Sequence, residues 1–252
     1  MDANKALFEY LVRIGDTYVV LSHRLGELCG HGPFLEEDIA QTNIALDLLG
    51  QARNILTYAG EVEGQGRGED DLAYHRDERH YCNFLLVEQP NEDFAHVIAR
   101  QFLFDAFNVE LLEAWRHSSD ETVAAIGQKA VKEATYHVKQ SGDWLIRLGD
   151  GTQESYERIV EAVDWMWPYT GELFTADEVD ETVAAMGISP HPDVLREAWD
   201  KRVNAVLAEA GLSRPADVPW QTGGKTGYHT EHLGYILAQM QYLPRIYPNA
   251  QW

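Results

Sequence analysis

The stretch LFEYLVRIGDTYVVLSHRLGEL, residues 7–28, repeats apolar side chains at alternating steps of four and three residues. This spacing places the apolar side chains on one face of an α-helix. Gly30, Gly32 and Pro33 then predict the end of that helix. The chain is therefore expected to open with a long amphipathic helix that buries one face against other helices. The positions that carry the repeat are Leu7, Leu11, Ile14, Tyr18, Leu21, Leu25 and Leu28.

The same periodicity continues along most of the chain and predicts an all-α protein. Further long helices are expected at residues 36–58, from about 91–93 to 117, and at 120–148. Asn91 and Asp93 are the candidate N-caps of the second of these, and Asp120 is the candidate of the third. Four long helices joined by short connections are typical of an antiparallel four-helix bundle. We therefore predict one domain over residues 1–252, with a core bundle at about 4–149 and accessory helices and a loop at 152–252. The shorter helices are expected at residues 79–87, 153–167, 177–186, 193–210 and 231–242, and the Gly- and Pro-rich loop at 211–228.

Charge and cysteine content limit the partners and the compartment. The chain of 252 residues has a formal net charge of −21, which argues against binding to nucleic acid or to an anionic membrane surface. Cys29 and Cys82 have no metal-ligand spacing and are not expected to pair, which indicates a reducing cytoplasm. The N-terminus has no signal-peptide pattern, and no apolar run is long enough to span a bilayer.

Part of a metal-binding pattern occurs in the fourth expected long helix, where Glu133 and His137 lie about one turn apart. Di-metal carboxylate bundles carry Glu-x-x-His on each of two helices and one Glu on each of the other two. Here Tyr136 stands at the position three after Glu133. The second helix offers Asp47 followed by Gly50, so glycine stands where the second histidine belongs. Two metals need about six protein ligands. These positions, together with Asp105 of the third helix, supply fewer.

Polar residues extend this pattern along each long helix. Because apolar residues flank them, we favour a buried polar network over the solvated face that such stripes usually form. Buried charges must be paired and hydrogen-bonded, so these residues would have to satisfy one another. The expected network contains Asn43, Asp47, Gln101, Asp105, Glu133 and His137. Further polar residues on or beside these faces are Arg13, Asp16, His23, Asn54, Asn108 and Gln140.

Other clusters are weaker candidates for a site. The pair Asp93 and His96 and the run His229–His232 are explained by helix starts. The run Gly223–Thr226 has the glycine and lysine that end a phosphate loop, but the upstream glycine and the strand are missing. We assign no metal or phosphate site to any of them.

Several long runs, in order along almost the whole chain, resemble the C subunits of phenylacetyl-CoA epoxidases. The resemblance implies a ferritin-like helical bundle within a bacterial multicomponent monooxygenase. It is carried by LSHRLGE (21–27), ALDLLGQARN (45–54), LVEQPN (86–91), KEATYH (132–137), YTGELF (169–174), TGGK (222–225), HTEHLG (229–234) and MQYL (240–243).

The resemblance also implies a division of labour between subunits. A homologous A subunit would hold the di-iron centre and epoxidise phenylacetyl-CoA, with O2 and with electrons from an NADPH-dependent reductase that carries a flavin and an iron–sulfur cluster. The C subunit would hold no cofactor, form a stable heterodimer or larger assembly with the A subunit, and serve as its scaffold. By family analogy, Glu181, Thr182 and Val183 are candidates for a peripheral contact with coenzyme A.

Two other functions remain open from the sequence. The chain could be an active di-iron oxygenase or ferroxidase with Asp47, Asp105, Glu133 and His137 as ligands. It could also be a stand-alone binding bundle without an enzymatic partner. The metal content of the protein, purified alone and with its partner, distinguishes the first of these from a structural subunit.

Overall fold

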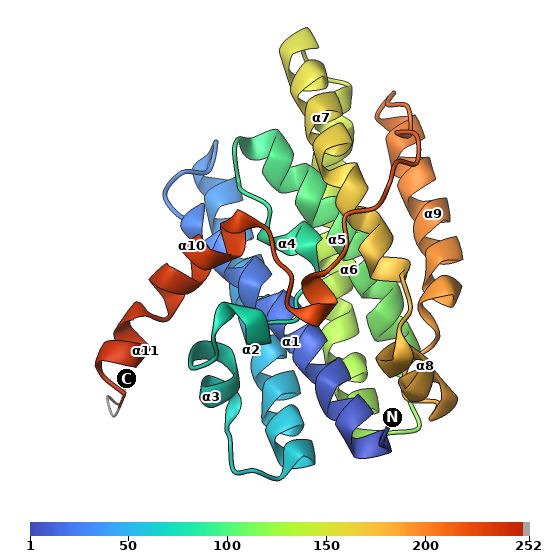
Figure 1. The fold of residues 1–252 in the computed structure, drawn as a ribbon. Coiled ribbons are helices and arrows are strands. Elements are labelled where there is room, and N and C mark those ends of the chain that lie inside the picture. Colours follow the sequence, from blue (N-terminus) through green and yellow to red (C-terminus); the bar gives the residue numbers. More distant parts are fainter. Residues whose placement is uncertain (249–252) are drawn as a thin grey trace. The chain divides into compact units, whose positions relative to one another are not determined.

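Residues 1–248 are described by a computed structural model (Figure 1). All regular structure in these residues is helical and none is strand, which confirms the predicted all-α class and is consistent with a ferritin-like helical bundle. The chain divides into two compact units: Met1–Glu88 with the segment from Thr222 onward, and Gln89–Gln221. We describe each unit by itself, and the predicted single domain stays a prediction. No helix in residues 1–248 is long and apolar enough to cross a membrane.

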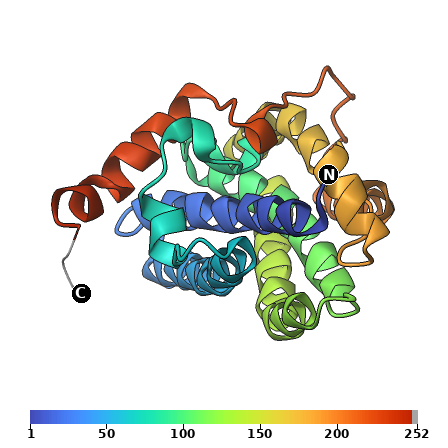
Figure 2. The ribbon, with the colours of Figure 1, turned by 60° about the horizontal axis from the view of Figure 1, so that its bottom comes forward.

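The first unit is built on an antiparallel pair of long helices, α1 (Ala3–Glu27) and α2 (Leu35–Glu63), which lie side by side in Figures 1 and 2. The predicted apolar repeat forms the buried face of α1. The two helices pack closely at Gly15, where a Cβ atom would come within 2.5 Å of Leu56 Cδ2. The second helix extends past the predicted residue 58 and ends at Gly64, which adopts the left-handed conformation with φ of 68°.

Short helices complete the first unit. The helix predicted at residues 79–87 is wrong: residues 81–84 are not helical there. The N–H of Cys82 donates to Asp16 and the N–H of Phe84 donates to Thr17 Oγ1, both on α1. Side chains of a neighbouring helix therefore satisfy backbone groups that a helix would have satisfied internally. These short elements are α3 (Glu69–Tyr74), η1 (Glu78–His80), α4 (Leu85–Glu88), η3 (Gly224–Thr226), α10 (Glu231–Met240) and α11 (Tyr242–Ile246).

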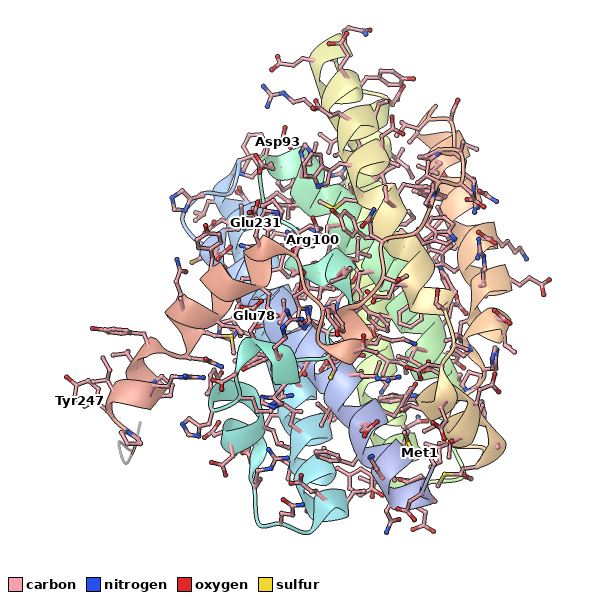
Figure 3. All side chains as sticks on the ribbon, in the orientation of Figure 1. Met1, Glu78, Asp93, Arg100, Glu231 and Tyr247 are labelled. Carbon is pink, nitrogen blue, oxygen red and sulfur yellow. The ribbon has the colours of Figure 1, made fainter. Side chains whose placement is uncertain are left out.

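The second unit contains the other antiparallel pair of long helices, α5 (Phe94–Trp115) and α6 (Glu121–Gly149). Of the two candidate caps of α5, Asp93 and not Asn91 is the N-cap: its side chain, labelled in Figure 3, accepts from the N–H of His96. Asp120 is confirmed as the N-cap of α6 and accepts from the N–H groups of residues 122 and 123. Each cap satisfies backbone donors that a helix start leaves unpaired.

Further helices of the second unit pack on α5 and on one another. The aromatic rings of Trp167, Phe174 and Trp199 form a buried cluster, with centroids 5.7 Å apart between Trp167 and Trp199. The indole N–H of Trp199 donates to the carbonyl of Leu103 at 2.9 Å and so joins the cluster to α5. These elements are α7 (Gln153–Met166), η2 (Trp167–Phe174), α8 (Glu178–Ala185) and α9 (Pro192–Glu209).

Candidate functional site

The second unit holds a buried carboxylate, Asp105 of α5, which has no exposed surface. Its Oδ1 accepts from Gln101 Nε2 at 2.7 Å, and its Oδ2 accepts from the Ser141 hydroxyl of α6 at 2.8 Å. The Ser141 hydroxyl also lies 2.9 Å from the carbonyl oxygen of His137. The side chain of His137 is fully buried as well. Asp105 is therefore held by neutral donors on two helices.

Burial raises the pKa of the Asp105 carboxyl to about 6. His137 and the hydrogen bonds from Ser141 and Gln101 favour the charged form and oppose this increase. A carboxyl that is removed from water without a full opposite charge holds its proton to higher pH than usual. Asp105 consequently changes its charge close to neutral pH.

These residues do not fit a two-metal centre. Both oxygens of Asp105 already accept hydrogen bonds from Gln101 and Ser141, which leaves this carboxylate engaged with neutral side chains. Glu133 is half-buried on α6, and Gly50 of α2 has no side chain to bind a metal. In residues 1–248, no group of three or more His, Cys, Asp or Glu side chains is arranged to hold a metal ion.

The polar positions of α2 differ from our expectation. Asn43, Gly50 and Asn54 lie on the exposed face of the helix, and Asp47 is half-buried. The expectation that Asn43 belongs to a buried network is therefore corrected. The buried face is rotated by about one residue from the predicted one, because this rotation buries two large apolar side chains, Ile44 and Leu48. Whether Asp47 meets Asp105, Glu133 and His137 stays a prediction.

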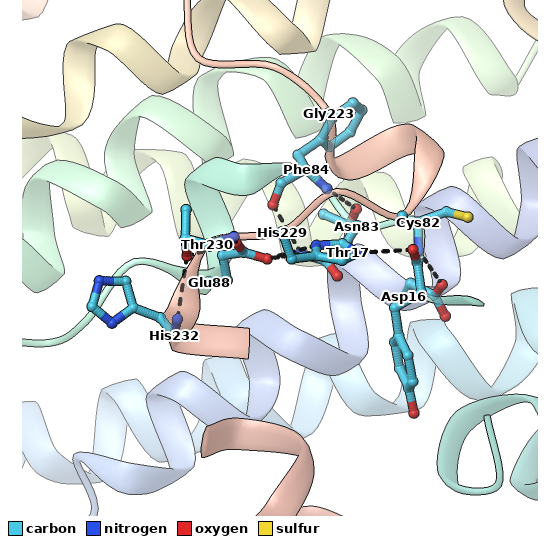
Figure 4. A network of polar contacts seen from close by, with 12 residues as sticks. Asp16, Thr17, Cys82, Asn83, Phe84, Glu88, Gly223, His229, Thr230 and His232 are labelled. Atoms are coloured by element: carbon cyan, nitrogen blue, oxygen red, sulfur yellow. Dashed lines mark hydrogen bonds and ion pairs between the residues drawn. The ribbon is translucent and has the colours of Figure 1, made fainter. Parts of the chain in front are cut away.

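The first unit contains a second buried carboxylate, Glu88 at the end of α4 (Figure 4). Its Oε2 accepts from Asn83 Nδ2 and pairs with His229 Nδ1, each at 2.9 Å. Its Oε1 accepts from the N–H and the hydroxyl of Thr230, at 2.6 and 2.7 Å. The guanidinium of Arg24 donates to the Glu88 carbonyl at 2.8 Å. Glu88 thus joins α1 and α4 to the segment that leads into α10.

His229 is a cation in this arrangement. Its Nε2 lies 2.8 Å from the carbonyl oxygen of Tyr81, which can only accept, and its Nδ1 faces the Glu88 carboxylate. Both ring nitrogens therefore carry protons. Burial lowers the pKa of His229, but the hydrogen bond and charge of Glu88, the Tyr81 carbonyl and the charge of Asp16 outweigh it, so the pKa lies above its usual value. The result is a buried ion pair with every donor satisfied.

A second ion pair lies in the same unit, between Asp16 of α1 and Arg76. Arg76 Nη1 donates to Asp16 Oδ2 at 3.0 Å, Arg76 Nη2 bonds the other oxygen, and the N–H of Cys82 also donates to Oδ2. Burial raises the pKa of Asp16 above its usual value even though Arg76 favours the charged form. Gln241 donates to the Arg76 carbonyl and to the Tyr81 hydroxyl, each at 2.8 Å, and so ties the end of α10 to this pair.

Sequence reasoning missed the Glu88 cluster. The sequence explains His229 and Thr230 as a helix start, and Thr230 does cap α10 by accepting from the N–H of His232. Glu88 follows the apolar run Phe84–Val87, and a single acid at the end of such a run has to find a buried partner. That signal marks Glu88, but no local pattern links it to a histidine 141 residues away.

The three candidate coenzyme A contacts lie on α8. Glu181 is exposed and pairs with His191 at 3.3 Å, and the Thr182 hydroxyl donates to the carbonyl of Glu178. The side chain of Val183 is fully buried and is not available to a ligand. A contact with coenzyme A at this helix stays a prediction.

The remaining candidates are placed as follows. Asn108 of α5 is fully buried and Gln140 of α6 is half-buried. Arg13 of α1 is buried, and His23 of the same helix has a pKa lowered by burial. Both cysteines are free thiols, and burial raises the pKa of Cys82 to about 11, so this thiol is a weak nucleophile near neutral pH.

Comparison with known proteins identifies the family of the chain. Residues 1–252 match the model of the family described as phenylacetic acid catabolic protein. The chain is also similar to the C subunit of 1,2-phenylacetyl-CoA epoxidase from Escherichia coli (strain K12). The two are 52% identical over 246 residues, which covers 98% of this chain and 99% of that protein. With a match over its full length, the chain belongs to the phenylacetic acid catabolic protein family.

Proposed function

We propose that this chain is the C subunit of a multicomponent 1,2-phenylacetyl-CoA epoxidase, and that it is a structural rather than a catalytic subunit. The support for the complex is the 52% identity to such a subunit along almost the full length of both proteins. In this role the chain binds a homologous catalytic subunit, and both subunits are needed for epoxidation of the aromatic ring. Its compartment is the cytoplasm.

The observation that carries the structural role is the engagement of Asp105. Its Oδ1 accepts from Gln101 and its Oδ2 accepts from Ser141, so neighbouring side chains of α5 and α6 already bind both carboxylate oxygens. The candidate ligand position on α5 that the sequence offers is therefore engaged in a hydrogen-bonded cluster with Gln101 and Ser141.

The cofactors of the complex then belong to the other subunits. The di-iron centre lies in the catalytic A subunit, and the flavin and the iron–sulfur cluster lie in the reductase. Phenylacetyl-CoA binds mainly to the catalytic subunit, with at most a peripheral contact at Glu181 and Thr182 of α8, which are the exposed and half-exposed members of that group.

Association and metal content test this proposal together. The chain, the homologous A subunit and their mixture are separated by size-exclusion chromatography with light scattering, and iron is measured in each peak. We expect a stable mixed complex, with the iron following the A subunit. Two separate peaks would contradict the scaffold role. Near-stoichiometric iron in the isolated chain, after growth with excess iron, would favour the di-iron oxygenase or ferroxidase instead.

A further inference from the structure

The outer face of α2 exposes apolar and uncharged residues over three turns. Ile39 and Leu46 are 50% and 61% exposed, and Asn43 and Gly50 lie on the same exposed stripe. The spacing of these four residues is four, three and four, which keeps them on one side of the helix. The uncharged part of this face runs from Ile39 to Gly50, with half-buried Asp47 beside it and exposed Arg53 one turn beyond it. Leu35 extends the apolar exposure to the start of the helix.

Gly50 lies in the interior of a 29-residue helix, where glycine is less stable than alanine. A Cβ atom at Gly50 would meet nothing within 4 Å, so packing inside the chain does not require glycine. This differs from Gly15 of α1, whose Cβ would collide with Leu56. A glycine on an open surface permits the close approach of a backbone from another molecule.

A pocket of about 440 Å³ borders this face. Leu46, Leu49 and Gly50 of α2 and Tyr74 of α3 line it. A second pocket, of about 600 Å³, shares Tyr74 and Asp70 with the first and continues to α10 and α11. The two pockets are therefore neighbours, and the first borders the exposed face of α2.

Acidic side chains line these two pockets together with a cation, Arg53. The first turn of α3 carries Glu69, Asp70 and Asp71 in sequence. Glu69 pairs with Arg53 at 3.2 Å, and Asp70 is exposed and lines both pockets. The whole chain adds a net charge of −21. A segment that fits here has apolar side chains for Leu46 and at least one Lys or Arg for Asp70.

We infer that the face of α2 from Ile39 to Gly50, with the pocket beside it, is the surface on which a helix of the catalytic subunit docks. The inference rests on the proposed function and names the surface that the partner uses. The helix approaches α2 most closely at Gly50 and places a basic residue near Asp70. A second copy of this chain is a poorer occupant, because a symmetric pair would bring two sets of the same acids together.

Two substitutions on this face test the surface. Leu46→Glu places a charge in the proposed contact, and Gly50→Leu blocks close approach while improving helix propensity. Matched controls on exposed positions of α9 in the other unit are Val194→Glu and Ala205→Leu. Each purified variant is titrated with the purified A subunit by calorimetry, and its melting temperature is measured alone.

We expect both α2 variants to bind the A subunit at least about tenfold more weakly, as truncation or blocking at the centre of an interface does. Gly50→Leu should raise the melting temperature of the isolated chain, so its weaker binding cannot come from poor folding. The two controls should bind like the natural chain, and its affinity should fall as salt is added.

The failures of the two proposals are distinguishable. Absence of binding by the natural chain would refute the proposed function itself. Tight binding by the natural chain and equally tight binding by both α2 variants would leave that function intact and overturn the docking surface. Self-association of the natural chain that Leu46→Glu abolishes would assign the surface to a second copy, and so overturn the chosen occupant.

Discussion

At the scale of single residues, the two buried carboxylates are stabilised in different ways. Asp105 accepts hydrogen bonds from two neutral side chains and has a raised pKa. Glu88 accepts from four donors, one of which is the charged His229. The stability that Asp105 contributes changes with pH near neutrality, whereas the Glu88 cluster is destabilised when either Glu88 or His229 is removed.

Asp105→Asn is expected to change the pH dependence of stability. The folded-state pKa of about 6 lies above the usual value of 3.8, so between these pH values the folded chain keeps a proton that the unfolded chain has lost. Stability therefore falls as pH rises through this window, by about 3 kcal/mol in total. Asparagine carries no such proton. Denaturant unfolding of both proteins from pH 4 to 7 should show the free energy of unfolding of the variant rising relative to that of the natural chain, by up to about 3 kcal/mol. The same pH dependence in both proteins would contradict the account.

Glu88→Gln is expected to destabilise the first unit, because it leaves the His229 cation without its anion. The free energy of unfolding should fall by roughly 3 kcal/mol at pH 6. The pKa of His229 is raised by folding, so the stability from its charge is present below about pH 6.5 and lost as pH rises through the folded value. The penalty of the substitution should therefore shrink towards pH 9. A penalty that is equal at pH 6 and pH 9 would contradict the loss of the His229 charge in this range.

At the scale of elements, the long helices are predictable and the short ones are not. The apolar repeat of residues 7–28 and the caps Asp93 and Asp120 are local signals, and the structure confirms them. The helix α3 has only six residues and shows no periodicity. The sequence wrongly predicts a helix at residues 81–84, because their extended form depends on Asp16 and Thr17, which lie more than sixty residues away.

The orientation of α2 shows a further limit of sequence patterns. Its polar stripe and its apolar stripe are neighbours on the helix surface, so a rotation of one residue decides which stripe is buried. Ile44, Leu48 and Ile55 take the buried side, and Asn43 and Gly50 the exposed side. The choice buries large apolar side chains in place of polar ones, and the polar stripe alone does not reveal it.

Two glycine substitutions are expected to act in opposite directions. A Cβ at Gly127 of α6 would lie 2.8 Å from the Trp115 Cβ and 2.9 Å from the backbone nitrogen of Arg116, so Gly127→Ala forces α5 and α6 apart. The loss in the free energy of unfolding should be about 1–3 kcal/mol. Gly50→Ala meets open space and should gain about 0.5–1 kcal/mol. Denaturant unfolding of both variants checks the signs, and a stabilising Gly127→Ala would contradict the helix contact.

At the scale of the whole molecule, the function follows from likeness along the full chain more than from any single site. The altered ligand positions at Gly50 and Tyr136 indicate from the sequence alone that a metal centre is incomplete. The sequence places Gln101 and Asp105 among the expected buried polar residues, but it does not predict Ser141, which completes their cluster from another helix. The net charge of −21 gives a long-range attraction for a partner with basic residues.

The docking variant should also affect turnover. If the catalytic subunit is active only in the complex, Leu46→Glu lowers the rate of phenylacetyl-CoA epoxidation at low subunit concentration. The rate should return to that of the natural chain when the variant is added in excess. Val194→Glu should need no excess. A rate that stays low at saturating Leu46→Glu would show that this face acts on catalysis beyond binding.

The central claim is tested most directly by titrating this chain into a fixed amount of the catalytic subunit, with reductase, NADPH, O2 and phenylacetyl-CoA, and measuring the epoxidation rate. We expect a negligible rate without the chain, and a rate that rises and saturates at a fixed ratio of the two subunits. Full activity of the catalytic subunit without the chain would contradict the scaffold role. Epoxidation by this chain with the reductase alone would show that it is itself the oxygenase.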